Sequence, residues 1–446
     1  MHVVRRGAPC NGSHMMAASG VKGHVNLSSY KGIIGNITLL VLSVFVSSLL
    51  LDRVLVVFGL PSQPPVPYSH PAGVNELRRN IEFAYRFTTN SYGLRDDDIP
   101  LAKPPGNRRI FVVGDSFAEG TGVEVSDRFT EQLEGYFQQA GREVSFINGG
   151  LAGRGPLEYA RVLLNVGLGY DVDGVLIVLY ANDVADTPPD ATPVDITSNS
   201  PVDLEPYVDH RLWRRAIQYL WPRVATQISL RRTARQYRER TRPDDFVEAV
   251  SHAAARAGIT PQQVEQWKAR LPASLVEAAN RGVFNGTILS SGLLYPARWT
   301  DSLDVDTTLA ERKWQAMASI LSAVAAASTQ RGLEVGVVFL PASFQYDPAS
   351  HSESSPWVGT GTVIRRAWLS GRSEFERRLQ VWATERAIPF LSLTDSFREA
   401  AKTQSSLTWP LDGHWTPQGH RVASLAIYRW MTTNPIFRSL GAIPAT

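Results

Sequence analysis

The sequence contains a single cysteine, Cys10, so no disulfide can form within the chain. Its nine histidines are scattered, and no Cys/His spacing typical of a zinc site occurs. The formal net charge is only +3, which does not indicate a nucleic-acid-binding protein. We therefore expect no metal, no cofactor and no nucleic-acid partner. The 446 residues are 43% apolar, which is enough for one large domain with an insertion or for two domains.

The N-terminal part predicts a membrane anchor. Residues 1–32 are polar and basic and predict a disordered tail, whereas 33–60 are mostly apolar and long enough to span a bilayer. A signal-anchor helix is the preferred interpretation; a cleaved signal peptide and a buried core helix are the alternatives. The basic tail predicts a cytoplasmic N-terminus and a periplasmic or extracellular C-terminal part. Residues 61–74 are rich in proline and serine and predict an extended linker.

Short apolar runs then alternate with amphipathic stretches. This alternation of predicted strands and helices predicts a doubly wound, flavodoxin-like α/β domain in two parts, 75–185 and 307–446. Ser126 is predicted to cap the first helix, and Gly141 to follow its end. The predicted strands cover 109–113, 144–148, 174–180, 335–340 and 389–393, and the main predicted helices cover 127–140, 156–168, 308–330, 374–386 and 417–432.

Residues 186–306 interrupt this alternation of strands and helices and predict a mostly helical insertion or lid. Thr260 and Gln263 have the spacing of a capping box with a proline between them. The stretch from Arg211 to Arg242 carries many arginines with interleaved aromatic residues. A solvated helical face is one interpretation, and contact with anionic headgroups or an acidic glycan is the other.

One stretch organises the chemistry. The apolar run 110–113 ends in Gly114, Asp115 and Ser116, which is typical of a buried strand that presents a nucleophile at the carboxyl end of a sheet. A serine hydroxyl needs a base and an orienting group. His414 is preferred as the base, with Asp412 as its partner, over His210, which lies in the insertion. His420 is interpreted as structural.

An acyl-transfer site also needs donors for the developing oxyanion. Three are available in principle: the backbone N–H of Ser116, a glycine N–H in the block 149–155, and the side-chain amide of Asn182. The glycine block lacks the full spacing of a dinucleotide loop, so a nucleotide role is not favoured.

These motifs, in this order, resemble the SGNH (GDSL-type) hydrolase superfamily over about residues 75–432, apart from the insertion. The resemblance implies that Ser116 is the nucleophile, His414 the base and Asp412 its partner. It implies an oxyanion hole made of Ser116, Gly153 and Asn182, with Asp115 bracing the turn. Gly153 is chosen because it stands where the family's block has its glycine.

Two departures from the family pattern matter. Tyr180 occupies a position that is often glycine, and the usual Asp-x-x-His is here Asp412-Gly413-His414. The shorter form is similar to a membrane-anchored branch that contains alginate O-acetyltransferase-like proteins.

We therefore expect a membrane-anchored serine hydrolase that cleaves acyl esters, above all O-acetyl esters, through an acyl-serine intermediate. One alternative is an O-acetyltransferase that modifies an extracytoplasmic polysaccharide, which implies an acyl donor from a membrane partner. A second is a catalytically silent glycan-binding module on the same fold.

Overall fold

The computed structural model of the chain describes residues 27–54, 69–70, 73–193, 220–221, 224, 245–404 and 406–434. It contains two compact units, 1–60 and 61–446, each considered by itself. Residues 1–26, His210 and all of the Arg-rich stretch 211–242 except 220–221 and 224 lie outside the described residues, so the predictions for them are untested.

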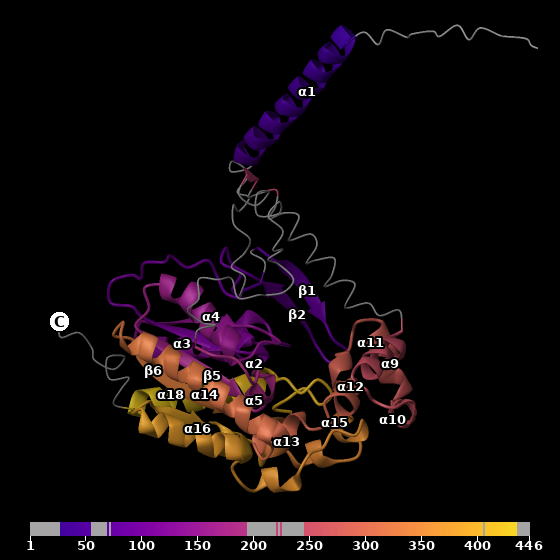
Figure 1. Ribbon diagram of the computed structural model, residues 1–446. Helices are drawn as coiled ribbons and strands as arrows, with labels where there is room; N and C mark the ends of the chain where they lie inside the picture. The colour runs from indigo at the N-terminus through magenta and orange to yellow at the C-terminus, as the bar shows by residue number, and fades with distance from the viewer. Residues whose placement is uncertain are drawn as a thin grey trace, which may run out of the picture. The chain divides into compact units, whose positions relative to one another are not determined.

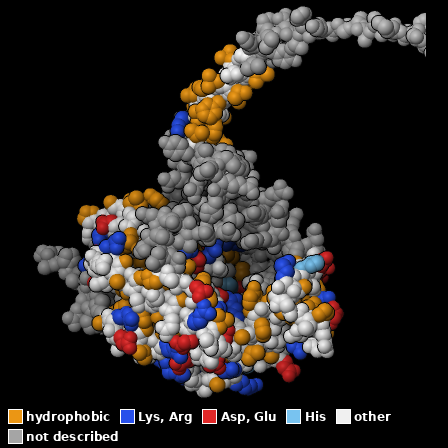
Figure 2. Space-filling model, in the orientation of Figure 1, with side chains coloured by type: hydrophobic (Ala, Val, Ile, Leu, Met, Phe, Trp, Pro, Cys, Tyr) orange, Lys and Arg blue, Asp and Glu red, His pale blue; other side chains and the backbone are white. Residues whose placement is uncertain are grey.

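The first unit contains the helix α1 (Leu27–Val54). The predicted tail is wrong at its end, because the helix begins at Leu27, before the apolar run. The polar residues there continue the helix, since helix hydrogen bonding does not require apolar side chains. Its segment Gly35–Val54 has a mean hydropathy of 2.0 and is long enough to cross a membrane, as a signal sequence would also be. Figure 2 shows hydrophobic side chains along this helix.

The second unit is built on a five-stranded parallel sheet, as predicted. Its order is β4-β3-β5-β6-β7, and numbering these strands along the chain gives 2-1-3-4-5, the flavodoxin-like doubly wound order. β3 lies between β4 and β5, with Val113 opposite Gly149 on one side and Ile177 on the other. The strands are β3 (Arg108–Gly114), β4 (Val144–Gly150), β5 (Gly174–Tyr180), β6 (Glu334–Leu340) and β7 (Phe390–Ser392).

Helices form a layer on each side of this sheet (Figure 1). α3 (Phe129–Gln139) packs against α18 (Pro417–Thr433), whereas α14 (Thr308–Thr329) contacts α4 (Pro156–Asn165) and reaches α16 (Glu374–Glu385) through the aromatic pair Trp314 and Phe375. The predicted cap of α3 is wrong: Ser126 lies in the 3-10 turn Val125–Asp127, and Arg128 stands at the cap position. Ser126 is thus part of a short turn before the helix and does not cap the helix.

The described part of the insertion is helical and has its own core. Its helices are α9 (Phe246–Arg256), α10 (Pro261–Lys268), α11 (Ala273–Asn280), α12 (Gly286–Leu294) and α13 (Arg298–Leu303), after α5 (Asp183–Asp186). Phe246, Trp267 and Phe284 lie in a buried cluster that is separate from the sheet's core. The capping box of Thr260 and Gln263 is confirmed. α9 to α12 gather at one end of the domain, beside the first two strands (Figure 1).

A hairpin that the sequence pattern did not reveal precedes the sheet. β1 (Asn75–Arg79) pairs antiparallel with β2 (Ala84–Thr88). The predicted linker 61–74 is wrong at its end, because Ser69 and His70 already pack on the domain: Ser69 Oγ donates to the Tyr92 carbonyl at 2.8 Å, and the His70 N–H to the Gly93 carbonyl at 3.1 Å. The hairpin and this segment border the site described next.

Candidate active site

Ser116 lies just after the end of strand β3. It is the first residue of the one-turn helix α2 (Ser116–Glu119), and the Asp115 carboxylate caps that helix by accepting the Phe117 N–H at 2.9 Å. Gly114 allows the sharp turn, because a Cβ there would come within 2.7 Å of the Ala118 Cβ and 3.0 Å of the Val178 carbonyl oxygen. The Ser116 hydroxyl is therefore presented at the carboxyl end of the sheet.

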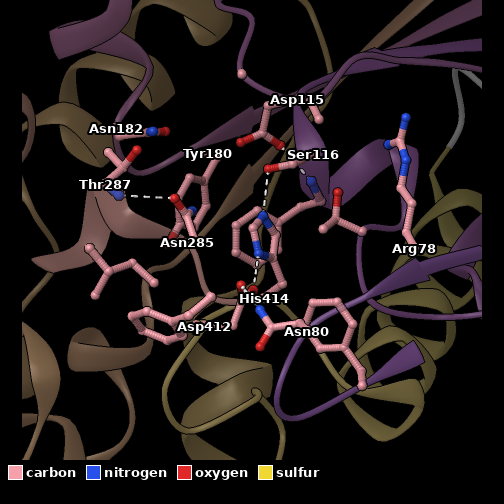
Figure 3. A pocket seen from close by; sticks show the side chains of 18 of the residues that line it. Arg78, Asn80, Asp115, Ser116, Tyr180, Asn182, Asn285, Thr287, Asp412 and His414 are labelled. Atoms are coloured by element: carbon pink, nitrogen blue, oxygen red, sulfur yellow. Dashed lines mark hydrogen bonds and ion pairs between the residues drawn. The ribbon is translucent and has the colours of Figure 1, made fainter. Parts of the chain in front are cut away.

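His414 and Asp412 reach Ser116 from the loop before α18. The Nε2 atom of His414 lies 2.7 Å from Ser116 Oγ, and its Nδ1 atom makes a short hydrogen bond with Asp412 Oδ1 (Figure 3). When Nε2 accepts the serine proton, Nδ1 donates to the carboxylate. Gly413 between them has φ +89°, a conformation that glycine adopts readily. The structure thus brings together the three residues that the sequence predicted as a triad.

Two further residues hold the Asp412 loop. Asn80 Nδ2 donates to Asp412 Oδ2 at 2.8 Å, and the Glu82 carboxylate accepts the backbone N–H groups of Leu411 at 2.9 Å and Asp412 at 2.7 Å. Both lie in the β1–β2 turn. Sequence reasoning missed them, because a polar turn residue carries no local sign of a partner so far along the chain.

The surroundings of His414 tune its basicity. Burial alone would lower the pKa of His414, but the charge and the hydrogen bond of Asp412, with Asp115 and Glu119 behind them, raise its pKa above the usual value. The Phe117 ring lies 5.0 Å from the imidazole, and Tyr180 stacks on Phe117 at 4.1 Å. Tyr180, which stands where the family often has glycine, therefore packs against the ring that contacts His414.

Asp115, the residue before Ser116, is buried. Burial raises the pKa of Asp115 to about 7, although the Phe117 N–H and His414 oppose that shift. Burial also raises the pKa of Asp183, whose carboxylate accepts the Tyr159 hydroxyl at 2.8 Å. Asp115 shapes the turn and the charge at the site without touching Ser116 Oγ.

The predicted oxyanion donors line the same cavity but are not equally available. Gly153 has φ +70° and is exposed, and no described hydrogen bond uses its N–H group. The Asn182 amide donates to Asp186 Oδ2 at 2.9 Å, and Asp186 is itself bound by Arg298 at 2.6 Å. Neither Gly153 nor Asn182 is hydrogen-bonded to Ser116 in the described part of the chain. The second N–H of the Asn182 amide remains for a ligand.

The site opens into a cavity of about 930 Å³. The sheet, the hairpin and the insertion all contribute to its wall, so the insertion borders the site. Its lining from the insertion comprises Gly282, Val283, Phe284, Asn285, Thr287, Ile288, Arg298 and Trp299, and that from elsewhere includes Arg78, Asn80, Arg154, Phe344 and Trp357. Figure 3 shows Asn285 and Thr287 of this wall facing the region of Ser116 and His414.

His420, another histidine near the site, is structural in its setting. His420 is buried, and its Nδ1 atom accepts the Phe129 N–H at 3.3 Å. Burial lowers the pKa of His420 to about 3, with the charges of Arg95 and Arg128 adding to that effect. In the ranges that the structure describes, no group of three His, Cys, Asp or Glu side chains is placed to hold a metal ion.

Comparisons with known proteins give only distant likenesses to solved structures. No protein-family model and no curated sequence matches the chain. Among solved structures it is similar to a G-D-S-L family lipolytic protein from Veillonella parvula, at 11% identity over 73% of this chain and 100% of that one, with a TM-score of 0.33. It is also similar to a catalytic mutant of the acetylxylan esterase Axe2 from Geobacillus stearothermophilus, at 13% identity over 74% and 95%, with a TM-score of 0.33. At these scores neither likeness bears on the activity of this chain.

Proposed function

We propose that the chain is a membrane-anchored serine hydrolase that cleaves acyl esters, above all O-acetyl esters. The observation that carries the proposal is the continuous hydrogen-bonded path from Ser116 through His414 to Asp412. A hydroxyl, an imidazole and a carboxylate in that order are what a serine nucleophile requires.

The reaction follows from these positions. Ser116 Oγ attacks the ester carbonyl carbon while His414 Nε2 takes its proton, and Asp412 stabilises the resulting imidazolium. The oxyanion accepts hydrogen bonds from the N–H groups of Ser116 and Gly153 and from the Asn182 amide. The carbon–oxygen bond to the alcohol then breaks, and His414 returns the proton to that alcohol. Water attacks acyl-Ser116 with His414 again as base, which releases the carboxylic acid and restores the serine.

A short test of this proposal uses p-nitrophenyl acetate and purified protein. Ser116→Ala is expected to lower turnover by about 10³–10⁶-fold. Ser343→Ala is the matched control, because Ser343 lines the same cavity and makes no described contact with His414. Equal turnover by wild type and Ser116→Ala would reject the proposal. A serine-reactive probe that labels neither protein would favour the silent glycan-binding module.

A second candidate, acyl transfer to a polysaccharide, is supported by an adjoining cavity. This cavity has a volume of about 700 Å³ and shares Ser343, Trp357 and Gly413 with the site. Its other lining residues are mostly hydroxyl, amide and aromatic groups, among them Ser350, Ser352, Ser354, Thr403, Gln404 and Trp409. Such groups suit the hydroxyls and flat faces of sugars. A sugar hydroxyl in place of water would take the acyl group from Ser116, and the acyl donor would come from a membrane partner.

Product analysis separates hydrolysis from transfer. Incubation with an acetyl donor and an oligosaccharide would give acetylated sugar for a transferase and only free acetate for a hydrolase. Trp357→Ala is expected to reduce transfer to an oligosaccharide at least about tenfold more than hydrolysis of p-nitrophenyl acetate. Equal losses of transfer and hydrolysis would indicate that Trp357 supports the folded active-site loop and does not bind the sugar.

A further inference from the structure

Glu119 is a buried carboxylate directly behind the candidate nucleophile. It ends the helix that Ser116 begins, and its side chain has no exposed surface. Its Oε1 atom accepts the Ala152 N–H at 3.1 Å and lies 2.5 Å from His70 Nε2. Its Oε2 atom accepts the Thr121 hydroxyl at 3.4 Å, and Arg78 lies 3.9 Å away. No step of the proposed reaction uses this residue.

The contact with Ala152 fixes the turn that carries Gly153. This turn is held at its start by the Leu151 N–H, which donates to the Gly114 carbonyl at 2.9 Å. Gly150 packs tightly on α2, because a Cβ there would come within 2.2 Å of the Glu119 backbone nitrogen. A Cβ at Gly153 would meet nothing within 4 Å, and the turn is held by side chains on either side of this glycine: Glu119 accepts the Ala152 N–H, and the Tyr159 hydroxyl donates to the Arg154 carbonyl at 3.1 Å.

His70 contacts the same carboxylate oxygen, Glu119 Oε1, as the Ala152 N–H. It lies in the segment that joins the N-terminal unit to the domain, and its ring meets the edge of Phe87 at 5.0 Å. Its backbone N–H is tied to the Gly93 carbonyl, as described above. A residue just outside the hairpin thereby reaches the back of the active site.

We propose that Glu119 is a positioning residue that sets the Ala152–Gly153 turn beside Ser116, and that His70 holds the Glu119 carboxylate in place. The inference rests on the proposed function for its effect on catalysis, because Gly153 matters only if an oxyanion forms there. A displacement of about 1 Å in such a donor can cost about 10²-fold in rate.

The charges around Glu119 support an ionised carboxylate. Burial alone would raise the pKa of Glu119, but His70, Arg78 and the Ala152 N–H together lower it to about 2. Arg95 and Arg128 from other elements add positive charge nearby, and Tyr85 faces it from β2. Glu119 in turn raises the pKa of His414, together with Asp412 and Asp115.

The test compares Glu119→Gln and His70→Ala in the full-length protein in detergent. Glu248→Gln and His252→Ala are matched controls, since this exposed Glu–His pair lies 3.6 Å apart on α9, away from the site. We expect Glu119→Gln to lower kcat on p-nitrophenyl acetate by about 10–100-fold, with KM changed less than about threefold. His70→Ala should cause a smaller loss of about 3–10-fold, and the controls none.

Two further readouts distinguish positioning from general stability. Hydrogen exchange at Ala152 should rise at least about tenfold in Glu119→Gln, while that of β4 stays unchanged. The acid limb of kcat/KM should move to lower pH, because losing the Glu119 charge lowers the pKa of His414. Unchanged exchange at Ala152, or an unchanged kcat, overturns the inference. So does exchange that rises throughout the sheet with a matching fall in Tm.

The two proposals fail in different ways. If the wild type shows no Ser116-dependent turnover, the proposed function is rejected, and exchange at Ala152 still decides whether Glu119 holds the turn. If Glu119→Gln does not fold, His70→Ala carries the test, because the His70 side chain is 21% exposed and its removal takes away the partner proposed to hold the Glu119 carboxylate against the Ala152 N–H. Full kcat and unaltered exchange in His70→Ala would then overturn the inference.

Discussion

The side chain of Asn80 donates a hydrogen bond to Asp412 at 2.8 Å across 332 positions of sequence. Both oxygens of the Asp412 carboxylate are therefore engaged, one by Asn80 and one by His414. Because the carboxylate is only slightly exposed, it cannot exchange these partners for water. The hairpin turn thus orients the Asp412 carboxylate, which in turn orients the His414 imidazole.

Replacing Asn80 tests that relationship. Asn80→Ala removes the donor to Asp412 Oδ2, and we expect kcat on an acetyl ester to fall by about 10–100-fold with a smaller change in KM. Asn107→Ala is the control, because Asn107 pairs with Ser145 at 3.0 Å away from the cavity. Steady-state kinetics on both variants suffices. A loss in Asn107→Ala as large as that in Asn80→Ala would show that the effect is not specific to Asp412.

The pH dependence of kcat/KM reports the state of His414. A neutral imidazole is required as base, so activity falls when His414 is protonated. Since Asp412 raises the pKa of His414 above the usual value of about 6.5, the loss should begin at higher pH than for a free histidine. Asp412→Asn should move the acid limb of the kcat/KM profile to lower pH and reduce the maximum value of kcat/KM. A flat profile from about pH 5 to 8 would contradict the role of His414.

The central strands and the nucleophile turn were predictable because their signals are local. The all-apolar β5 and the run that ends at Gly114 show burial and termination within a few residues of sequence. The Asp412-Gly413-His414 spacing likewise placed two members of the site. Asn80, Glu82 and Glu119 were not predictable in their roles, because their partners come together only when the hairpin, α2 and the last loop pack. The cap of α3 was misread because Ser126 lies inside a 3-10 turn directly before the helix, and the sequence pattern did not separate that turn from the helix.

The role of Asn182 can be separated from that of its neighbour. Loss of one oxyanion donor typically costs about 10²–10³-fold in kcat, so we expect that loss for Asn182→Ala. Asp186 accepts the Asn182 amide and, as a carboxylate, has no N–H to donate to an oxyanion, so Asp186→Asn should cost less than about tenfold. Turnover of p-nitrophenyl acetate by the two variants decides the matter. Equal losses would mean that Asn182 acts only through its bond to Asp186.

Substitution of Gly413 tests whether the backbone conformation between Asp412 and His414 is required. At φ +89°, Gly413→Ala introduces about 1–3 kcal/mol of backbone strain, although its Cβ would meet Trp357 at an ordinary 3.5 Å. We expect a fall of a few degrees in Tm and a larger relative loss of kcat, since relief of the strain displaces Asp412 and His414. Gly135→Ala, in open space on α3, is the control and should lower neither quantity. Thermal melts and kinetics measured on the same samples would show whether the loop is that sensitive.

The apolar helix α1 is either a membrane anchor or a cleaved signal sequence. An anchor stays on the mature protein, whereas a signal sequence is removed, so the two can be distinguished by experiment. A span of 20 residues with mean hydropathy 2.0 is long enough to stay in the bilayer. If it is an anchor, the full-length protein should remain with membranes after alkaline carbonate extraction and keep an N-terminal tag, whereas a chain that begins at Ser62 should be released. Arg53→Leu, a change at the helix end that leaves the apolar span intact, should not alter the fractionation. A mature protein that lacks the tag and is found in the soluble fraction would show that α1 is a signal sequence, and the enzyme would then reach its substrate without an anchor.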